Sequence, residues 1–147
     1  VYKRQFHVSS FNRSAAGIDA VRVLMQNLER DRAVAIFPEG SRSPDGTMQQ
    51  GMHGVIYLAI KSQAAILPVG LTGTEKFPLW RIAFPFRKMN AKIGPPFTLP
   101  IIEGKPSKEV MSSLLDMVMG RIADQLPPER RGFYGRQTKQ EPAEQVV

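Results

Sequence analysis

Short continuous apolar runs alternate with apolar residues at helical spacing along most of this chain, and this alternation constrains the fold more than any other feature. Such runs, bounded by proline or glycine, are typical of buried strands. They predict strands at residues 34–37 and 65–69. Phe6, Val8 and Phe11 indicate a first strand at residues 5–11, and residues 91–94 indicate a short strand that a proline turn ends. Apolar residues three or four positions apart predict helices at residues 15–29, 54–62 and 106–126. The order of these elements predicts an α/β fold, a mixed sheet flanked by helices.

The length of 147 residues fits a single domain. Pro127 and Pro128 end the last predicted helix, so we assign residues 1–128 to the folded domain. Residues 129–147 are polar and lack apolar periodicity, which predicts a disordered tail. The chain begins with Val1 rather than methionine, and we expect the domain to be partial, without its N-terminal part.

The charge balance favours an anionic partner. The chain has 20 Lys and Arg against 13 Asp and Glu, a formal net charge of +7, which suits phosphate groups, acidic lipid headgroups or nucleic acid. Cysteine is absent, which excludes disulfides, thiol catalysis and Cys-ligated zinc. No apolar run approaches the roughly 18 residues of a membrane-spanning helix, and no signal peptide is visible.

The loop after the apolar run 34–37 gathers groups that suit a phosphate, and ligands of open α/β sheets bind beyond the carboxyl ends of strands. Arg42 offers a planar fork of donors, Gly40 lets backbone N–H groups approach, and Ser41 adds a hydroxyl. Glu39 repels phosphate, but its carboxylate suits a substrate hydroxyl or a neighbouring arginine. Composition alone is more typical of a plain polar turn after a strand.

Residues 37–43, Phe-Pro-Glu-Gly-Ser-Arg-Ser, resemble the third signature block of the lysophosphatidic acid and glycerol-3-phosphate acyltransferases, usually written F-P-E-G-T/S-R-S. Three other segments resemble the family's second block, its fourth block and its late strand and turn, in that order: Phe11-Asn12-Arg13, Ile66-Leu67-Pro68-Val69 and Lys92-Ile93-Gly94-Pro95-Pro96. The resemblance covers roughly residues 11–100, and it implies the glycerolipid acyltransferase-like fold.

The resemblance also implies an activity and a site. The implied reaction moves a fatty acyl group from acyl-CoA or acyl-ACP to 1-acyl-glycerol-3-phosphate, which gives phosphatidic acid in phospholipid biosynthesis. The alternative acceptors are glycerol-3-phosphate and another lysophospholipid. No cofactor or metal is implied, and the implied location is a membrane surface on the cytoplasmic face. By position, the residues that bind the acceptor phosphate are Arg13, Glu39, Gly40, Ser41 and Arg42.

The family's first block, His-x-x-x-x-Asp, supplies a general base and the carboxylate that orients it. Asn12 stands five residues after His7, and Leu58 stands five residues after His53, so neither histidine fits. We therefore assign no catalytic residue, expect the pair upstream of Val1, and expect this fragment alone to be inactive. The alternative from a different class is a non-catalytic module that binds phosphate or anionic lipid.

Residues 76–92 interleave five bases with four aromatic rings and contain no acid. This composition suits a membrane interface, where rings sit at headgroup depth and cations meet anionic lipid. It equally suits a loop whose rings fill the core while its bases stay solvated. A single-stranded nucleic-acid platform has the same composition, but that interpretation rests on basicity alone, and we expect no nucleic-acid partner.

Overall fold

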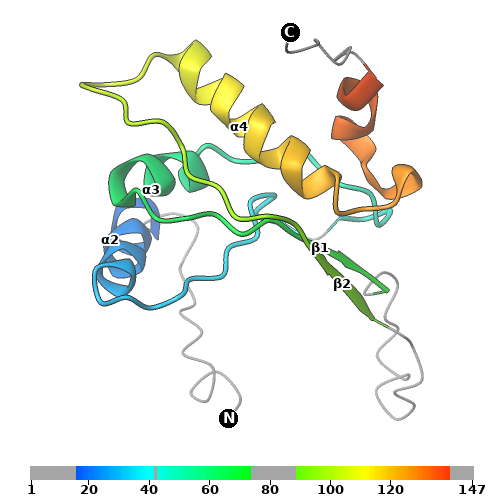
Figure 1. The fold of residues 1–147 in the computed structure, drawn as a ribbon, viewed down its shortest axis with the longest axis horizontal. Coiled ribbons are helices and arrows are strands. Elements are labelled where there is room, and N and C mark those ends of the chain that lie inside the picture. Colours follow the sequence, from blue (N-terminus) through cyan, green and yellow to red (C-terminus); the bar gives the residue numbers. More distant parts are fainter. Residues whose placement is uncertain (1–15, 42, 74–88, 140–147) are drawn as a thin grey trace, which may run out of the picture. The chain divides into compact units, whose positions relative to one another are not determined.

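The computed structural model describes residues 16–41, 43–73 and 89–139 (Figure 1). Contacts divide the chain into two compact units, Val1–Ala35 and Ile36–Val147. The second unit contains both described strands, most of the described helices and the loop that follows residue 36. The part of the candidate site that is described therefore belongs to the second unit.

Helix α2 (Ala16–Leu28) is the described helix of the first unit, and it confirms the helix predicted at residues 15–29. Asp31, just beyond the helix, adopts a left-handed φ of +54°, a conformation that aspartate tolerates better than most residues. This turn ends the helix. Apolar residues at helical spacing are half-buried: Val21, Leu24, Met25 and Leu28.

Two longer elements of the second unit confirm the other helix predictions. Helix α3 spans Gly54–Ser62, the range that the sequence predicted, and helix α4 spans Lys108–Ala123, within the predicted 106–126. Ser107 caps α4, because its hydroxyl accepts a hydrogen bond from the Val110 N–H at 3.3 Å and satisfies a donor that the helix itself leaves unpaired. None of the helices in the described ranges is long and apolar enough to span a membrane.

Strands β1 (Val69–Thr72) and β2 (Asn90–Ile93) pair antiparallel. Pro68, directly before β1, cannot donate to a ladder because it has no N–H. On its other side a single bridge joins Ile66 and Phe97, whose N–H groups donate to each other's carbonyls at 2.7 and 3.0 Å. The proline thus sits at the end of the strand, as the sequence required.

The described residues combine helices with two strands in one antiparallel pair, which is compatible with the predicted α/β fold. β2 confirms the strand predicted at 91–94, whereas the strand predicted at 65–69 shifts to β1, because a proline interrupts it. Residues 34–37 form no strand, and Phe37 is 76% exposed. A buried strand needs neighbours that pair its backbone, and no described strand pairs with this run. The strand predicted at 5–11 lies outside the described residues.

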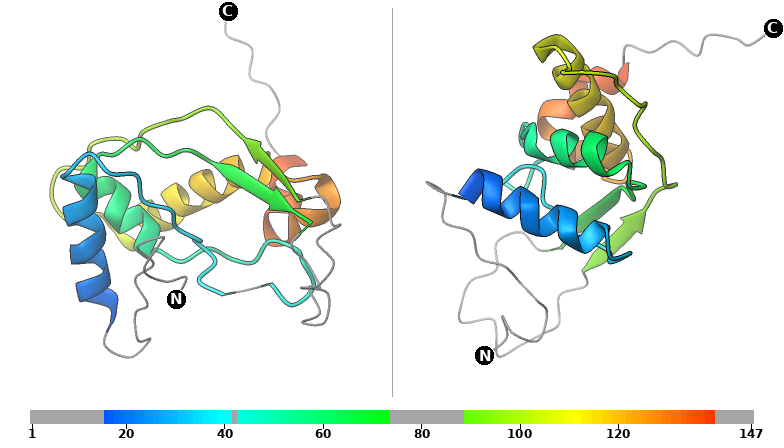
Figure 2. Two further views of the ribbon diagram at one scale, coloured as in Figure 1. Left: turned by 90° about the horizontal axis from the view of Figure 1, so that it is seen from below. Right: turned by 90° about the vertical axis from the view of Figure 1, so that its left-hand side faces the viewer.

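The core of the second unit lies where α3 and the C-terminal segment, residues 128–139, pack against α4 (Figure 2). Ile56 of α3 and Met119 of α4 are completely buried. The guanidinium of Arg121 lies 4.2 Å from the centre of the Phe97 ring and links α4 to the bridge near the sheet. The other core residues are Met48, Ala59, Leu99, Leu114, Leu115, Val118, Ala123 and Tyr134.

The end of the described chain forms two 3-10 helices, η2 (Pro128–Arg130) and η3 (Gly132–Lys139), where the sequence predicted a disordered tail over 129–147. The physical reason is Tyr134, which is 1% exposed and belongs to the core. One buried aromatic residue can anchor a polar segment that has no apolar periodicity, and composition does not reveal it. Residues 140–147 lie outside the described residues.

Candidate functional site

The signature loop (residues 37–53) begins with a tight turn. The Gly40 N–H donates to the Phe37 carbonyl at 3.1 Å, and Gly40 has a left-handed φ of +67°. A Cβ at this position would also collide with the sulfur of Met52. Glycine is therefore required for the turn itself and for the close approach of the loop's two ends.

Glu39 holds the signature loop together. Its Oε2 accepts a hydrogen bond from the Gln49 N–H at 2.8 Å. Beside it the Met52 N–H donates to the Pro38 carbonyl, also at 2.8 Å. The sequence left open whether this carboxylate contacts a substrate hydroxyl or an arginine. In the structure it contacts the loop's own backbone, ten residues further along the chain.

The remaining predicted site residues divide between described and undescribed parts of the chain. Ser41 follows the turn and is exposed. Arg13 and Arg42 lie outside the described residues, so their phosphate contacts stay predictions. Of the five residues proposed for the acceptor, the structure brings Glu39, Gly40 and Ser41 together in one turn.

Asp45 organises the middle of the signature loop. Its Oδ1 accepts hydrogen bonds from the Ser43 hydroxyl, the Thr47 N–H and the Thr47 hydroxyl at 2.8, 2.9 and 2.8 Å. The Ser43 hydroxyl in turn accepts from the Gly46 N–H at 2.9 Å. These donors, the Thr47 N–H first, lower the pKa of Asp45 from 3.8 to about 2, because they stabilise its charged form. The turn signal Pro-Asp-Gly in the sequence marks this feature.

The second half of the signature loop is attached to the C-terminal segment. The Met48 N–H donates to the Arg130 carbonyl at 2.9 Å, and the Phe133 N–H donates to the Met48 carbonyl at 3.1 Å. Arg130 Nη1 also donates to the Gly46 carbonyl at 3.3 Å. Gly132, between the two attachments, has a φ of +48°, and a Cβ there would collide with the Met48 carbonyl. Sequence reasoning missed these contacts.

Tyr134 adds a further attachment. Its hydroxyl accepts a hydrogen bond from the Gly51 N–H at 3.1 Å. Burial is the main cause that raises the pKa of this hydroxyl. Gly51 also lies against α4, since a Cβ there would come within 2.8 Å of the Met119 sulfur. The chain around Gly51 is thus held between α4 and the C-terminal segment.

His53, the histidine that the structure describes, has no carboxylate partner among its contacts with the described residues. His53 is exposed, and its Nε2 lies 3.3 Å from the Ser112 hydroxyl of α4. A serine hydroxyl is not the carboxylate that would stabilise an imidazolium. His7 lies outside the described residues. Across the described ranges no group of three or more His, Asp or Glu side chains is placed to hold a metal ion.

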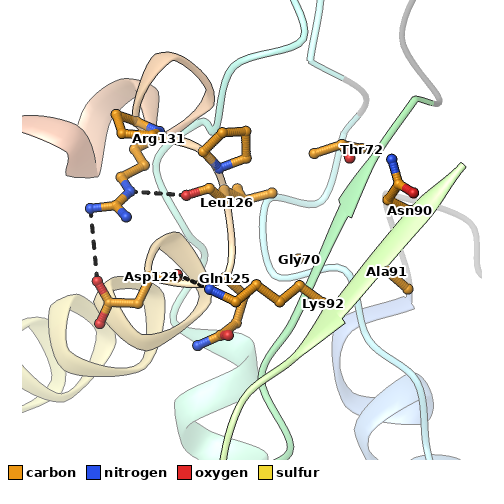
Figure 3. Close-up of a pocket in the computed structure, with 11 residues that line it drawn as sticks. Gly70, Thr72, Asn90, Ala91, Lys92, Asp124, Gln125, Leu126 and Arg131 are labelled. Atoms are coloured by element: carbon orange, nitrogen blue, oxygen red, sulfur yellow. Dashed lines mark hydrogen bonds and ion pairs between the residues drawn. The ribbon is translucent and has the colours of Figure 1, made fainter.

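A groove of about 400 Å³ lies between the β1–β2 pair and the connection that follows α4 (Figure 3). Its charged lining residues are Lys92, Asp124 and Arg131. Both cations are engaged with the chain itself: Arg131 Nε donates to the Leu126 carbonyl at 3.1 Å, and Lys92 Nζ donates to the Asp124 carbonyl at 3.4 Å. No lining residue belongs to the signature loop, so the groove and the loop are separate features.

The basic aromatic stretch predicted at 76–92 lies largely outside the described residues, which omit 74–88. It connects β1 to β2 along the chain. Met89 and Lys92, at its described end, are exposed. Both interpretations of its aromatic rings, contact with a membrane and packing in the core, stay predictions.

Comparison with known proteins relates part of this chain to a known family. Residues 2–72 match the sequence profile of the family described as Acyltransferase. This range includes the arginine-containing segment near residue 13 and the seven-residue block 37–43 at the start of the signature loop. Over this stretch, just under half of the chain, the sequence is similar to the acyltransferase family.

The relatives it resembles are named 1-acyl-sn-glycerol-3-phosphate acyltransferase. The relative from Cocos nucifera is 27% identical over 128 residues, which cover 83% of this chain and 39% of the relative. The relative from Borreliella burgdorferi is 35% identical over 71 residues, 48% of this chain and 27% of its own. The relative from Limnanthes alba is 41% identical over 57 residues, which cover 39% of this chain and 19% of the relative. The chain thus spans well under half the length of these relatives. No solved structure matches it.

Proposed function

We propose that the protein to which this chain belongs transfers a fatty acyl group from acyl-CoA or acyl-ACP to 1-acyl-glycerol-3-phosphate, and so makes phosphatidic acid for phospholipid biosynthesis. The acceptor hydroxyl oxygen attacks the thioester carbonyl and its proton passes to a base. The C–S bond then breaks, and the donor leaves as a thiolate that takes the proton from the base. The names of the relatives and the seven-residue block at 37–43 support this proposal.

The observation that carries the proposal is the closed turn at the start of the signature loop. The hydrogen bonds of the Glu39 carboxylate and of the Met52 N–H hold this turn closed. The residue that follows the turn, Ser41, is exposed. Arg42 is the next residue in the sequence. A fixed turn that precedes an arginine limits the entropy lost when its guanidinium binds two phosphate oxygens. Arg13 supplies the second cation of the proposed site.

The chain itself supplies the acceptor side of this reaction. Neither His7 nor His53 stands five residues before an aspartate, so the base is not assigned to any of these 147 residues. A bound phosphate would hold the acceptor hydroxyl in place for attack, which is a contribution of position rather than of proton transfer.

The test is binding of a short-chain lysophosphatidic acid to the wild type and to Arg42→Ala, measured by titration calorimetry. Loss of a charged hydrogen-bonding partner costs about 1.5–3 kcal/mol, so Kd should rise roughly 10- to 100-fold. Arg30→Ala, at an exposed position outside the block, is the matched control and should bind as the wild type does. Equal affinity of Arg42→Ala and the wild type would remove Arg42 from the site. Glycerol-3-phosphate and lysophosphatidylcholine, titrated in parallel, identify the preferred acceptor.

We also propose that the protein works at a membrane surface on the cytoplasmic face. One face of the β1–β2 pair supports this, because it is apolar and exposed: Val69 and Leu71 lie two residues apart on β1, and Ile93 is opposite Val69. The segment that connects the strands is rich in bases and aromatic residues. Such a pairing of apolar surface and positive charge favours anionic bilayers.

The membrane proposal is tested by flotation with vesicles of phosphatidylglycerol and phosphatidylcholine. The double variant Leu71→Gln/Ile93→Gln should float several-fold less than the wild type. Ile101→Gln, at a residue that is 81% exposed elsewhere in the unit, is the control and should float normally. If the double variant and the wild type float equally, this face does not meet the membrane.

A further inference from the structure

We infer that Tyr134 and the chain around it act as a positioning element for the acceptor site, by holding the signature loop in its binding conformation. This inference rests on the proposed function. Tyr134 lies 83 residues after Gly51, the partner of its hydroxyl, and outside the stretch 2–72 that matches the family. Its role therefore follows from contacts in the structure.

A short path of contacts leads from Tyr134 to the turn. The hydroxyl binds the Gly51 N–H at 3.1 Å. The next residue, Met52, donates its N–H to the Pro38 carbonyl at 2.8 Å, and its sulfur fills the space above Gly40. A shift of Gly51 would therefore move the two contacts that close the turn before Ser41.

The anchor is buried, whereas the first part of the signature loop is largely exposed. The Tyr134 side chain is 1% exposed, and its ring meets the Phe133 ring edge-on, with centroids 5.0 Å apart. Residues 40, 41, 44 and 45 of the loop are exposed. Loops with few buried contacts open locally at small free-energy cost unless they are fastened to the core. The hydroxyl of Tyr134 and the hydrogen bonds of Met48 are such fastenings.

The consequence concerns affinity more than stability. In Tyr134→Phe the ring still fills the core, and the hydrogen bond to Gly51 is lost. A typical hydrogen bond of this kind corresponds to about a threefold to tenfold change in an equilibrium constant. We expect the amides of residues 46–52 to exchange with solvent about that much faster, and the Kd for lysophosphatidic acid to rise by a similar factor.

The experiment measures amide exchange and lysophosphatidic acid binding in the wild type, Tyr134→Phe and the control Tyr57→Phe, whose ring is half exposed on α3. It adds a double-variant cycle with Arg42→Ala. If Tyr134 acts through the loop that carries Arg42, the two effects on Kd are not additive. A merely structural residue would lower Tm and leave the effects additive. Arg130→Met, which removes the donor to the Gly46 carbonyl and keeps the aliphatic stem, repeats the exchange measurement if Tyr134→Phe folds poorly.

The outcomes separate the two proposals. Faster exchange together with a raised, non-additive Kd supports the positioning role. Wild-type binding with an equal Kd in Tyr134→Phe overturns the positioning role alone. No binding by the wild type overturns the proposed function, and with it the role of Tyr134 at an acceptor site. Unchanged exchange in both Tyr134→Phe and Arg130→Met overturns the fastening itself.

Discussion

Apolar side chains are buried in the helical core of the second unit but exposed on its β1–β2 pair. In the core, Ile56 and Met119 are completely buried between helices. On the strand pair, Leu71 and Ile93 are 46% and 61% exposed, although their residue types are as apolar. The signature loop is fastened to the first of these regions, through Gly51 and Met48. The difference indicates that contacts with the helical core hold the loop in place, whereas the strand pair presents an exposed apolar surface.

The largest expected effect comes from opening a cavity in the core. Met119→Ala should lower the free energy of unfolding by about 2–5 kcal/mol, because the removed atoms leave a gap beside α3 and Gly51. Leu71→Ala is the counterpart on the strand pair and should cost below about 1 kcal/mol, because its side chain is half in solvent. Urea unfolding followed by circular dichroism measures both. Similar losses for the two variants would break the comparison.

A second variant sharpens the comparison at the junction of the loop and the C-terminal segment. Gly132→Ala combines a left-handed φ of +48° with a collision at the Met48 carbonyl. It should destabilise the fold by about 1–3 kcal/mol.

The matched control is Gly120→Ala on α4, where a Cβ has open space. It should stabilise the fold by about 0.5–1 kcal/mol, because alanine favours a helix over glycine. Thermal unfolding of both variants provides the measurement, and destabilisation by Gly120→Ala but not Gly132→Ala would contradict the close approach.

The sequence predicted local features of this structure better than contacts between distant residues. Helix α3 was predicted to the residue, because the helical repeat is a local signal. The core role of Tyr134 was not predicted, because its partner Gly51 is 83 residues away and a single aromatic in a polar segment leaves no pattern.

The run 34–37 is a local signal that predicted a structure the described residues do not form. Its composition predicts a strand, but a strand exists only with partners, and the described residues provide none for it. Within the site, the turn at Gly40 followed from its residue type, whereas the role of Glu39 did not. A carboxylate has many possible donors, and only the fold selected the Gln49 N–H.

The smallest expected effect is local and depends on pH. The pKa of Asp45 is depressed from 3.8 to about 2, so its hydrogen bonds favour the folded loop above pH 3.8 and lose that contribution as the pH falls toward 2. Carboxyl NMR shifts should titrate near pH 2 in the wild type, and nearer pH 3.8 in Ser43→Ala. A wild-type midpoint near 3.8 would show that the turn in solution lacks these bonds.

The most direct test of the central claim removes the phosphate from the ligand instead of changing the protein. A short-chain lysophosphatidic acid and the monoacylglycerol with the same acyl chain differ only in that group. If the signature loop binds the acceptor phosphate, the Kd of the monoacylglycerol should be roughly 10- to 100-fold higher, as expected for the loss of charged hydrogen bonds. Equal Kd values for the two ligands would contradict the account.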